Sequence, residues 1–258
     1  PRYSGYKNIM AKENSADALN VSELREYLTR YHRPVWAEID LDGVAQNVRE
    51  FRRILLPQTE IMAVVKADAY GHGAAQVAQA ALQSGAAWLA VALVEEGICL
   101  RRRGISAPIL LLGISASGTE RAVFAHDLRP AICSVESARR FSECGAMTGQ
   151  TVRFHLKLDT GMGRIGVRLD ELPAFLDAVR RLPALEMEGV FTHFAKADET
   201  DKTSARLQMR RFDDGWRMIQ QAGFAPRLRF LANSAGAMEL PASHADMARI
   251  GISLYGLY

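Results

Sequence analysis

A lysine closes an apolar segment at residue 66. Lys66 follows the run that begins at Ile61, and a short turn that contains Tyr70 and His72 comes directly after it. Burial penalises the ammonium form of a lysine and favours its neutral, nucleophilic amine. Lys66 is therefore a candidate for Schiff-base formation, and the alternative is a lysine whose ammonium group extends out to water. The hydroxyl and imidazole groups of the following turn favour the first interpretation.

A second group of charges lies between residues 157 and 164. Lys157 and Asp159 fall near the end of a predicted strand, and Arg164 follows in a glycine-rich loop. Cations so placed can bind an anionic oxygen of a substrate or cofactor. A surface ion-pair cluster is the alternative interpretation of the same residues.

The glycines of this loop match a dinucleotide-binding pattern. Gly161, Gly163 and Gly166 have the spacing G-x-G-x-x-G after a strand. That fingerprint requires a helix to begin among the glycines, so that its N-terminus faces the pyrophosphate. Here Asp170 is the expected N-cap and Pro173 lies in the first turn, so the helix begins after the last glycine. The sequence therefore argues against a nicotinamide or flavin site.

Polar groups accompany the ends of three further predicted strands. His193 has no partner at metal-ligand spacing, so we interpret it as a hydrogen-bonding residue and expect no metal. Asn233 and Ser234 follow the seventh strand of the pattern, and residues 249–256 span the end of the eighth. In barrels the loops after these strands often bind phosphate. Ser234 would supply a hydroxyl and Gly251 a close backbone approach, although the sequence around Asn233 also suits a plain loop.

Regular elements must position these residues, and the chain after Pro34 alternates strand-length apolar runs with helical patterns. After a first strand at Val35–Asp40, strands are predicted at residues 61–66, 88–92, 109–112, 129–133, 152–158, 187–191, 228–231 and 247–250. Helices are predicted at residues 74–83, 94–103, 137–144, 171–181 and 204–222, with Leu207 facing the core. Eight strand-helix units in about 200 residues predict an α/β fold, the (β/α)8 TIM-type barrel, with a doubly wound sheet as the alternative. A barrel requires its functional side chains at the C-terminal ends of the strands.

Composition limits the classes of partner. The chain has 258 residues, of which 48% are hydrophobic and 24% charged, and its net charge of +3 indicates neither a nucleic-acid nor a membrane partner. Its 3 cysteines suggest neither a disulfide framework nor a zinc site, and they fit a reducing cytoplasm. The longest apolar run, Ala86 to Val94, is far shorter than the roughly 20 residues of a membrane-spanning helix, and no signal peptide is recognisable. We therefore expect a cytoplasmic protein.

Two regions are predicted along the chain. Residues 1–34 are polar and form an N-terminal extension, whereas residues 35–258 form the barrel domain. The chain begins with Pro1 rather than Met and ends at Tyr258 without a polar tail. From these ends we expect a fragment or a processed chain.

The segment from Ala63 to Gly73 resembles the attachment signature for pyridoxal 5'-phosphate (PLP) in the alanine racemases. The similarity continues in order through residues 36–41, 88–92, 157–166, 193–199, 233–234 and 249–257, and so covers nearly all of the chain after residue 34. It implies a PLP-binding barrel in an enzyme that interconverts L- and D-alanine and supplies D-alanine for peptidoglycan precursors. The cofactor-binding residues that it implies are Lys66, Tyr70, His193, Asn233, Ser234, Arg249, Gly251 and Ile252.

The resemblance also implies individual roles, with a catalytic set of Lys66, Arg164, His193 and Arg249. Lys66 would carry PLP as a Schiff base and act as the base on one face of the substrate Cα. The phosphate would be held by Tyr70, Ser234, Gly251 and Ile252. Arg249, supported by His193, would face the pyridine nitrogen, and because an arginine stays protonated it would make PLP a weaker electron sink than a carboxylate does. Arg164 would contact the ring oxygen or the substrate carboxylate, and Lys157, carbamylated in some members of the family, would orient it.

One feature of the family has no counterpart in this sequence. Alanine racemases have a β-rich C-terminal domain, which supplies a tyrosine as the opposite-face base across a homodimer interface, and this chain ends where that domain should begin. Racemisation removes a proton from one face and returns it on the other. We therefore expect the isolated chain to hold the cofactor half of the site, and to form a homodimer when that domain is present. The alternatives are a serine or broad-specificity racemase and a non-catalytic, single-domain PLP-binding protein of PLP homeostasis, against which the turn after Lys66 argues.

Overall fold

The computed structural model describes residues 22, 26, 29–30 and 37–257. The chain divides into two compact units, Pro1–Ile39 and Asp40–Tyr258. In the first unit, residues 22, 26, 29 and 30 are helical and exposed. The predicted extension of residues 1–34 lies almost wholly outside the described residues, so its boundary stays a prediction.

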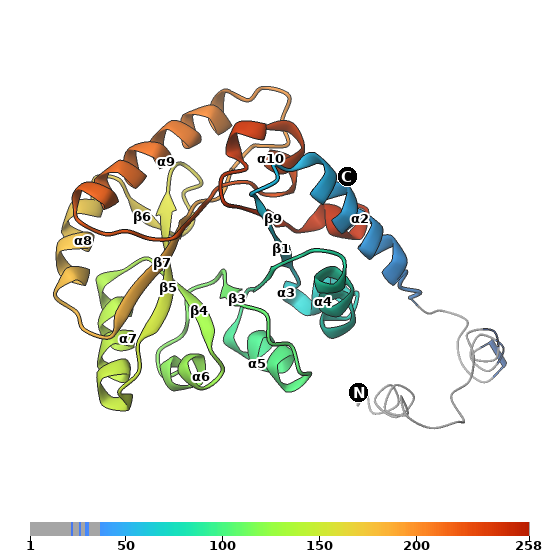
Figure 1. Cartoon of the computed structure of the whole chain (residues 1–258), viewed down its shortest axis with the longest axis horizontal. Coiled ribbons are helices and arrows are strands. Elements are labelled where there is room, and N and C mark those ends of the chain that lie inside the picture. Colours follow the sequence, from blue (N-terminus) through green and yellow to red (C-terminus); the bar gives the residue numbers. More distant parts are fainter. Residues whose placement is uncertain (1–21, 23–25, 27–28, 31–36, 258) are drawn as a thin grey trace. The chain divides into compact units, whose positions relative to one another are not determined.

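The second unit is a parallel barrel (Figure 1). Its strands are β1 (Glu60–Val64), β2 (Trp88–Val91), β3 (Ile109–Leu111), β4 (Leu128–Ile132), β5 (Val152–Asp159), β7 (Leu185–Phe191), β8 (Leu228–Phe230) and β9 (Met247–Ile250). They pair in the order β8-β7-β5-β4-β3-β2-β1-β9, and the short β6 (Val167–Arg168) pairs with β5. The outer strands β8 and β9 meet where Arg249 N donates to Ala232 O at 3.0 Å and Asp246 N donates to Arg229 O at 3.1 Å. The barrel is thus nearly closed, which confirms the predicted (β/α)8 fold and excludes the doubly wound sheet.

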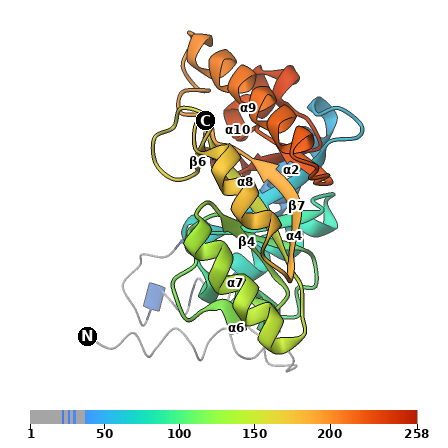
Figure 2. The same cartoon turned by 90° about the vertical axis from the view of Figure 1, so that its left-hand side faces the viewer.

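Helices surround the strands. They are α2 (Leu41–Ile54), α3 (Lys66–Gly71), α4 (Ala74–Gln83), α5 (Val94–Arg102), α6 (Glu120–Ala125), α7 (Val135–Thr148), α8 (Leu172–Arg180), α9 (Thr203–Gln221) and α10 (Ser234–Glu239), with 3-10 turns η1 (Pro241–Ser243) and η2 (Ile252–Tyr255). Figure 2 shows α7, α8 and α9 covering one side of the barrel. Among the described residues, no helix is both long and apolar enough to cross a membrane.

The barrel encloses a small core of its own, separate from the layer between strands and helices. Its buried apolar residues are Met62, Val64, Trp88, Ala90, Leu110, Ala131, Phe191, Leu228, Phe230 and Met247. Three polar side chains are buried beside them and meet at one carboxylate. Arg129 Nε lies 3.1 Å from Glu188 Oε2, and His155 Nε2 lies 3.2 Å from the same oxygen. Burial lowers the pKa of His155, so its neutral ring donates to the carboxylate.

Two local predictions are wrong. No strand forms at residues 37–40, the described part of the expected first strand; instead Asp40 accepts a hydrogen bond from Gly43 N at 3.0 Å and caps α2, a helix that the sequence reasoning missed. In α9, Leu207 is exposed and Gln208 takes the inward position. A polar residue holds that position because its amide makes hydrogen bonds with Thr160, His193 and Ala195.

Candidate active site

Lys66 stands two residues beyond the end of β1, where the backbone reverses its handedness. The four residues after it, Ala67 to Tyr70, have φ values between 51° and 55°. Left-handed helical backbone costs a non-glycine residue about 1–2 kcal/mol, so four such residues in succession are unusual. The turn carries the Tyr70 ring back beside Lys66, whose Nζ lies 5.6 Å from the centre of that ring.

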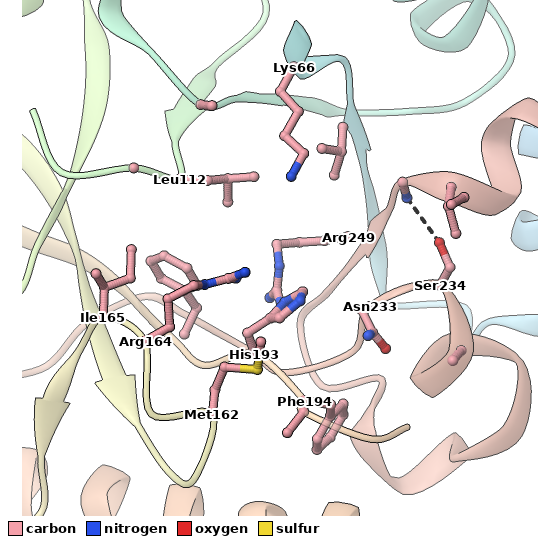
Figure 3. A pocket seen from close by; sticks show the side chains of 18 of the residues that line it. Lys66, Leu112, Met162, Arg164, Ile165, His193, Phe194, Asn233, Ser234 and Arg249 are labelled. Atoms are coloured by element: carbon pink, nitrogen blue, oxygen red, sulfur yellow. Dashed lines mark hydrogen bonds between the residues drawn. The ribbon is translucent and has the colours of Figure 1, made fainter. Parts of the chain in front are cut away.

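A cavity of about 730 Å³ opens at this end of the barrel. Every predicted site residue lines it, namely Lys66, Tyr70, Lys157, Arg164, His193, Asn233, Ser234, Arg249, Gly251 and Ile252. Figure 3 shows the side chains of Lys66, Arg164 and Arg249 pointing into the same space from different sides. The structure thus brings together residues from β5, from β9 and from the segments that follow β1, β5, β7, β8 and β9. Lining residues that were not predicted as site residues include Leu112, Gly113, Met162, Ile165, Phe191, Phe194 and Asp198.

Arg249 is buried at the floor of the cavity. Its Nη2 donates to Thr192 O at 2.7 Å and to Leu231 O at 3.1 Å, and the guanidinium lies over the ring of Phe230, 5.4 Å from its centre. Burial lowers the pKa of Arg249 to about 9, so the group is still a cation near neutral pH. Its Nε makes no hydrogen bond to any described residue, which leaves the Nε–H free for a ligand.

His193 contacts this arginine. Arg249 Nη2 lies 3.3 Å from His193 Nδ1. Burial, and then the charges of Arg249 and Arg164, lower the pKa of His193 to about 3. The imidazole is therefore neutral at physiological pH.

Lys157 projects from β5 into the same group of cations. Burial, and then the charges of Arg249 and Arg164, lower its pKa to about 8. Asp159 does not pair with it: one carboxylate oxygen of Asp159 accepts hydrogen bonds from Gly161 N and Gly163 N, both at 3.0 Å. The predicted cationic cluster therefore forms without Asp159, whose carboxylate shapes the glycine loop.

The glycine loop does not open a helix. Helix α8 begins at Leu172, well after Gly166, and its N-cap is Glu171 rather than the expected Asp170. The short strand β6 comes directly after the loop instead. The loop thus lacks the helix N-terminus that a dinucleotide fingerprint requires.

The loops after β8 and β9 meet at Ser234. Its Oγ accepts a hydrogen bond from Gly251 N at 3.0 Å, the contact drawn in Figure 3. A Cβ atom at Gly251 would lie 3.2 Å from the hydroxyl of Tyr70, so the missing side chain keeps this corner of the cavity open. Asn233 also caps α10, because its side-chain oxygen accepts a hydrogen bond from Gly236 N at 2.9 Å. Ile252 is exposed beside them.

Gln208 supports the site from below, and the sequence reasoning missed it. This buried side chain donates to His193 O at 2.9 Å and to Thr160 Oγ1 at 3.1 Å, and it accepts from Ala195 N at 2.9 Å. It thereby joins the loop after β5 to the loop after β7. A polar residue at a buried helical position was the available signal, because such a group needs hydrogen-bond partners.

Charge defines what the cavity can bind. Among the described residues that line it, four carry cationic side chains, Lys66, Lys157, Arg164 and Arg249, and one, Asp198, carries a carboxylate. Such an excess of cations favours anionic groups such as phosphate and carboxylate. The fold and the cavity together define a parallel β/α barrel with a predominantly cationic cavity at the carboxyl ends of its strands.

Comparison with known proteins identifies the family. The family model for the N-terminal domain of alanine racemase matches residues 39–258. The alanine racemase of Symbiobacterium thermophilum is 48% identical over 225 residues, which are 87% of this chain and 59% of that protein. The alanine racemase of Synechocystis sp. is 46% identical over 224 residues, 86% of this chain and 60% of that protein. The alanine racemase structure from Bacillus anthracis with bound L-Ala-P has a TM-score of 0.84 and 37% identity, covering 88% of this chain and 59% of that one.

The chain therefore belongs to the alanine racemase family, as the motif order predicted. It spans about three fifths of the length of the relatives it matches, 59% and 60% of the two just named. The match gives no support to the nicotinamide oxidoreductase or the non-catalytic PLP-binding alternatives.

Proposed function

We propose that the protein to which this chain belongs interconverts L- and D-alanine, with PLP bound in the cavity at the carboxyl end of the barrel. One observation carries the proposal: Lys66, the Arg249–His193 pair and the Ser234–Gly251 contact line the same cavity of about 730 Å³. That volume lies within the usual range for small-molecule sites. Membership in the alanine racemase family supports the reaction and the substrate.

The residues of the cavity fit PLP group by group. The open corner at Gly251, with the hydroxyls of Ser234 and Tyr70 beside it, suits a phosphate group. Asn233 and Ile252 would complete the cofactor site. The free Nε–H of Arg249 suits an uncharged acceptor such as a pyridine nitrogen. Lys66 supplies the amine for covalent attachment. Bound PLP would act as the sink for the electrons left when a proton leaves the substrate Cα.

The chain's own residues would divide the work on the substrate. Lys66 Nζ removes or returns the proton on one face of Cα. Arg164, exposed at the rim of the cavity, binds the substrate carboxylate or the ring oxygen of the cofactor. Lys157 orients Arg164; a carbamate on Lys157 would exchange its positive charge for a negative one, which suits a position beside Arg164 and Arg249.

Racemisation also requires a proton donor on the opposite face of Cα. We propose that it is a tyrosine outside the 258 residues, contributed across a homodimer interface, as the family resemblance implies. The relatives support a longer functional unit, because this chain covers only 59% of the first of them. We place this enzyme in the cytoplasm, without a nucleic-acid or membrane partner.

Exchange of the Cα hydrogen tests the proposal. PLP-loaded protein in D2O should exchange the Cα hydrogen of alanine, and Lys66→Ala should abolish the exchange. Serine and other amino acids in the same assay measure the breadth of the substrate range. Protein that PLP cannot convert to a coloured form, or exchange that survives Lys66→Ala, would contradict the proposal. Full racemase activity of residues 1–258 alone would refute the proposal that the second proton donor lies outside these residues.

A further inference from the structure

Glu96 connects two turns at the rim of the barrel. One oxygen of its carboxylate, Oε2, accepts hydrogen bonds from Ala92 N at 2.7 Å and Leu93 N at 2.9 Å. The other oxygen, Oε1, accepts from Ala67 N at 2.5 Å. The bond to Leu93 N is an ordinary feature of a helix N-terminus, where a glutamate in the first turn reaches back to the N-cap. The bond to Ala67 lies outside helix capping and needs another explanation.

Ala67 is the first residue of the left-handed turn, and its N–H belongs to the peptide unit that follows Lys66. A backbone of this handedness persists in non-glycine residues only where surrounding groups hold it. The far end of the turn is held by Asp68, whose side chain accepts from Ala74 N at 2.7 Å and whose backbone oxygen accepts from Gly73 N at 2.9 Å. Glu96 holds the near end, the one attached to Lys66.

We propose that Glu96 is a positioning residue for Lys66 and Tyr70. By fixing the peptide unit after Lys66, its carboxylate sets the direction in which the turn leaves β1. That direction keeps Lys66 Nζ and the Tyr70 ring side by side at 5.6 Å and both groups on the cavity. The inference rests on the proposed function, because it assigns Glu96 to the attachment and proton transfer at Lys66.

Glu96→Gln breaks the link selectively. Each carboxylate oxygen accepts from a different turn, whereas an amide has one acceptor oxygen and an NH2 group that only donates. The glutamine can keep the hydrogen bonds to one turn but loses those to the other. Glu95→Gln is the matched control, because Glu95 is the preceding residue in the first turn of α5, is exposed, and makes no hydrogen bond to a described residue. Glu96→Asp keeps two acceptor oxygens on a shorter side chain and should give an intermediate effect.

The first readout is amide hydrogen exchange in the full chain without cofactor. Glu96→Gln should speed exchange at residues 67–70 by about tenfold or more, because a hydrogen bond to a charged group is lost. The second readout is the visible circular dichroism of lysine-bound PLP, which reports the orientation of the cofactor. The spectrum should change in Glu96→Gln and stay as in the wild type in Glu95→Gln. In the assay of Cα hydrogen exchange, Glu96→Gln should lower kcat by a larger factor than it raises KM.

Three results would overturn the proposal: unchanged exchange at residues 67–70 in Glu96→Gln, exchange that rises equally in the barrel strands, or the same changes in Glu95→Gln. If Glu96→Gln does not fold, Glu96→Asp decides by the same readouts. A wild-type protein that fails to bind PLP would refute the proposed function. The amide exchange would still show whether Glu96 fixes the turn.

Discussion

Arg249 Nη2 lies 3.3 Å from His193 Nδ1, and because a guanidinium only donates hydrogen bonds, His193 accepts through this nitrogen. The ring proton of His193 is therefore on Nε2. The pKa of His193 is lowered to about 3 and that of Arg249 to about 9, so the pair consists of a neutral ring and a cation throughout the physiological range. Arg249 can orient a ligand acceptor but does not exchange protons with it.

Arg249→Lys should destabilise the barrel. Arg249 Nη2 makes the contacts to Thr192 O, Leu231 O and His193 Nδ1, and a lysine ammonium ends one bond short of that position, so at least one buried group loses its partner. We expect the free energy of unfolding in urea to fall by about 3 kcal/mol. Arg164→Lys, at an exposed position, should change it by less than about 0.5 kcal/mol. Equal effects of the two substitutions would be inconsistent with the anchored guanidinium.

His193 should make stability depend on pH. The unfolded imidazole binds a proton near pH 6.5 and the folded one near pH 3, so the unfolded state holds more protons between these values and stability falls as the pH drops through this window. His193→Asn should reduce the slope of unfolding free energy against pH, measured from pH 6 to pH 4.5, by about 1.4 kcal/mol per unit. His155 is present in both the wild type and the His193→Asn variant, so its contribution to the slope cancels in the comparison. Identical slopes would show that His193 is not held neutral.

Glu188→Ala should be strongly destabilising. Glu188 is buried among Arg129 and His155, and although burial alone would raise its pKa, these partners lower it to about 2. Removing the carboxylate leaves the buried Arg129 with Asp127 as its remaining ion-pair partner. We expect a loss of about 3 kcal/mol in thermal or urea unfolding. Glu186→Ala, at an exposed position on the same strand, is the control, and a similar loss there would argue against a specific buried pair.

Gly251→Ala should weaken PLP binding more than it weakens the fold. The added Cβ would stand 3.2 Å from the Tyr70 hydroxyl, in the corner assigned to the phosphate. Displacing one phosphate-binding group should lower PLP affinity by about tenfold, measured by titration of the visible absorbance. Free inorganic phosphate should compete with PLP in the wild type and less well in the variant. Unchanged affinity would place the phosphate elsewhere.

Much of the architecture could be predicted from the sequence. The eight strands lie within about two residues of their predicted positions, because strands buried on both faces are continuous apolar runs such as Ile109 to Leu112. Of the ten site residues, Lys157 and Arg249 lie near the carboxyl ends of β5 and β9 and the other eight follow strands, and the closure of a barrel brings such positions together. The closed barrel could therefore be predicted without knowledge of any side-chain contact.

Other features could not be predicted, for physical reasons. The left-handed turn at Ala67 contradicts the backbone preference of its own residues and is held by Glu96, a residue distant in the sequence. The inward position of Gln208 depends on the partners it finds below His193. The group around Glu188 forms only when β4, β5 and β7 are assembled. In each case a contact between distant segments outweighs the local pattern.

The role of Lys66 is tested most directly by locating the covalently attached cofactor. Protein loaded with PLP is reduced with borohydride, digested, and mapped by mass spectrometry. We predict the mass of reduced PLP on the peptide that contains Lys66, and none on the peptides that contain Lys157 or Lys196. Cofactor attached to Lys157, or spread over several lysines while Lys66 stays free, would contradict the proposed function.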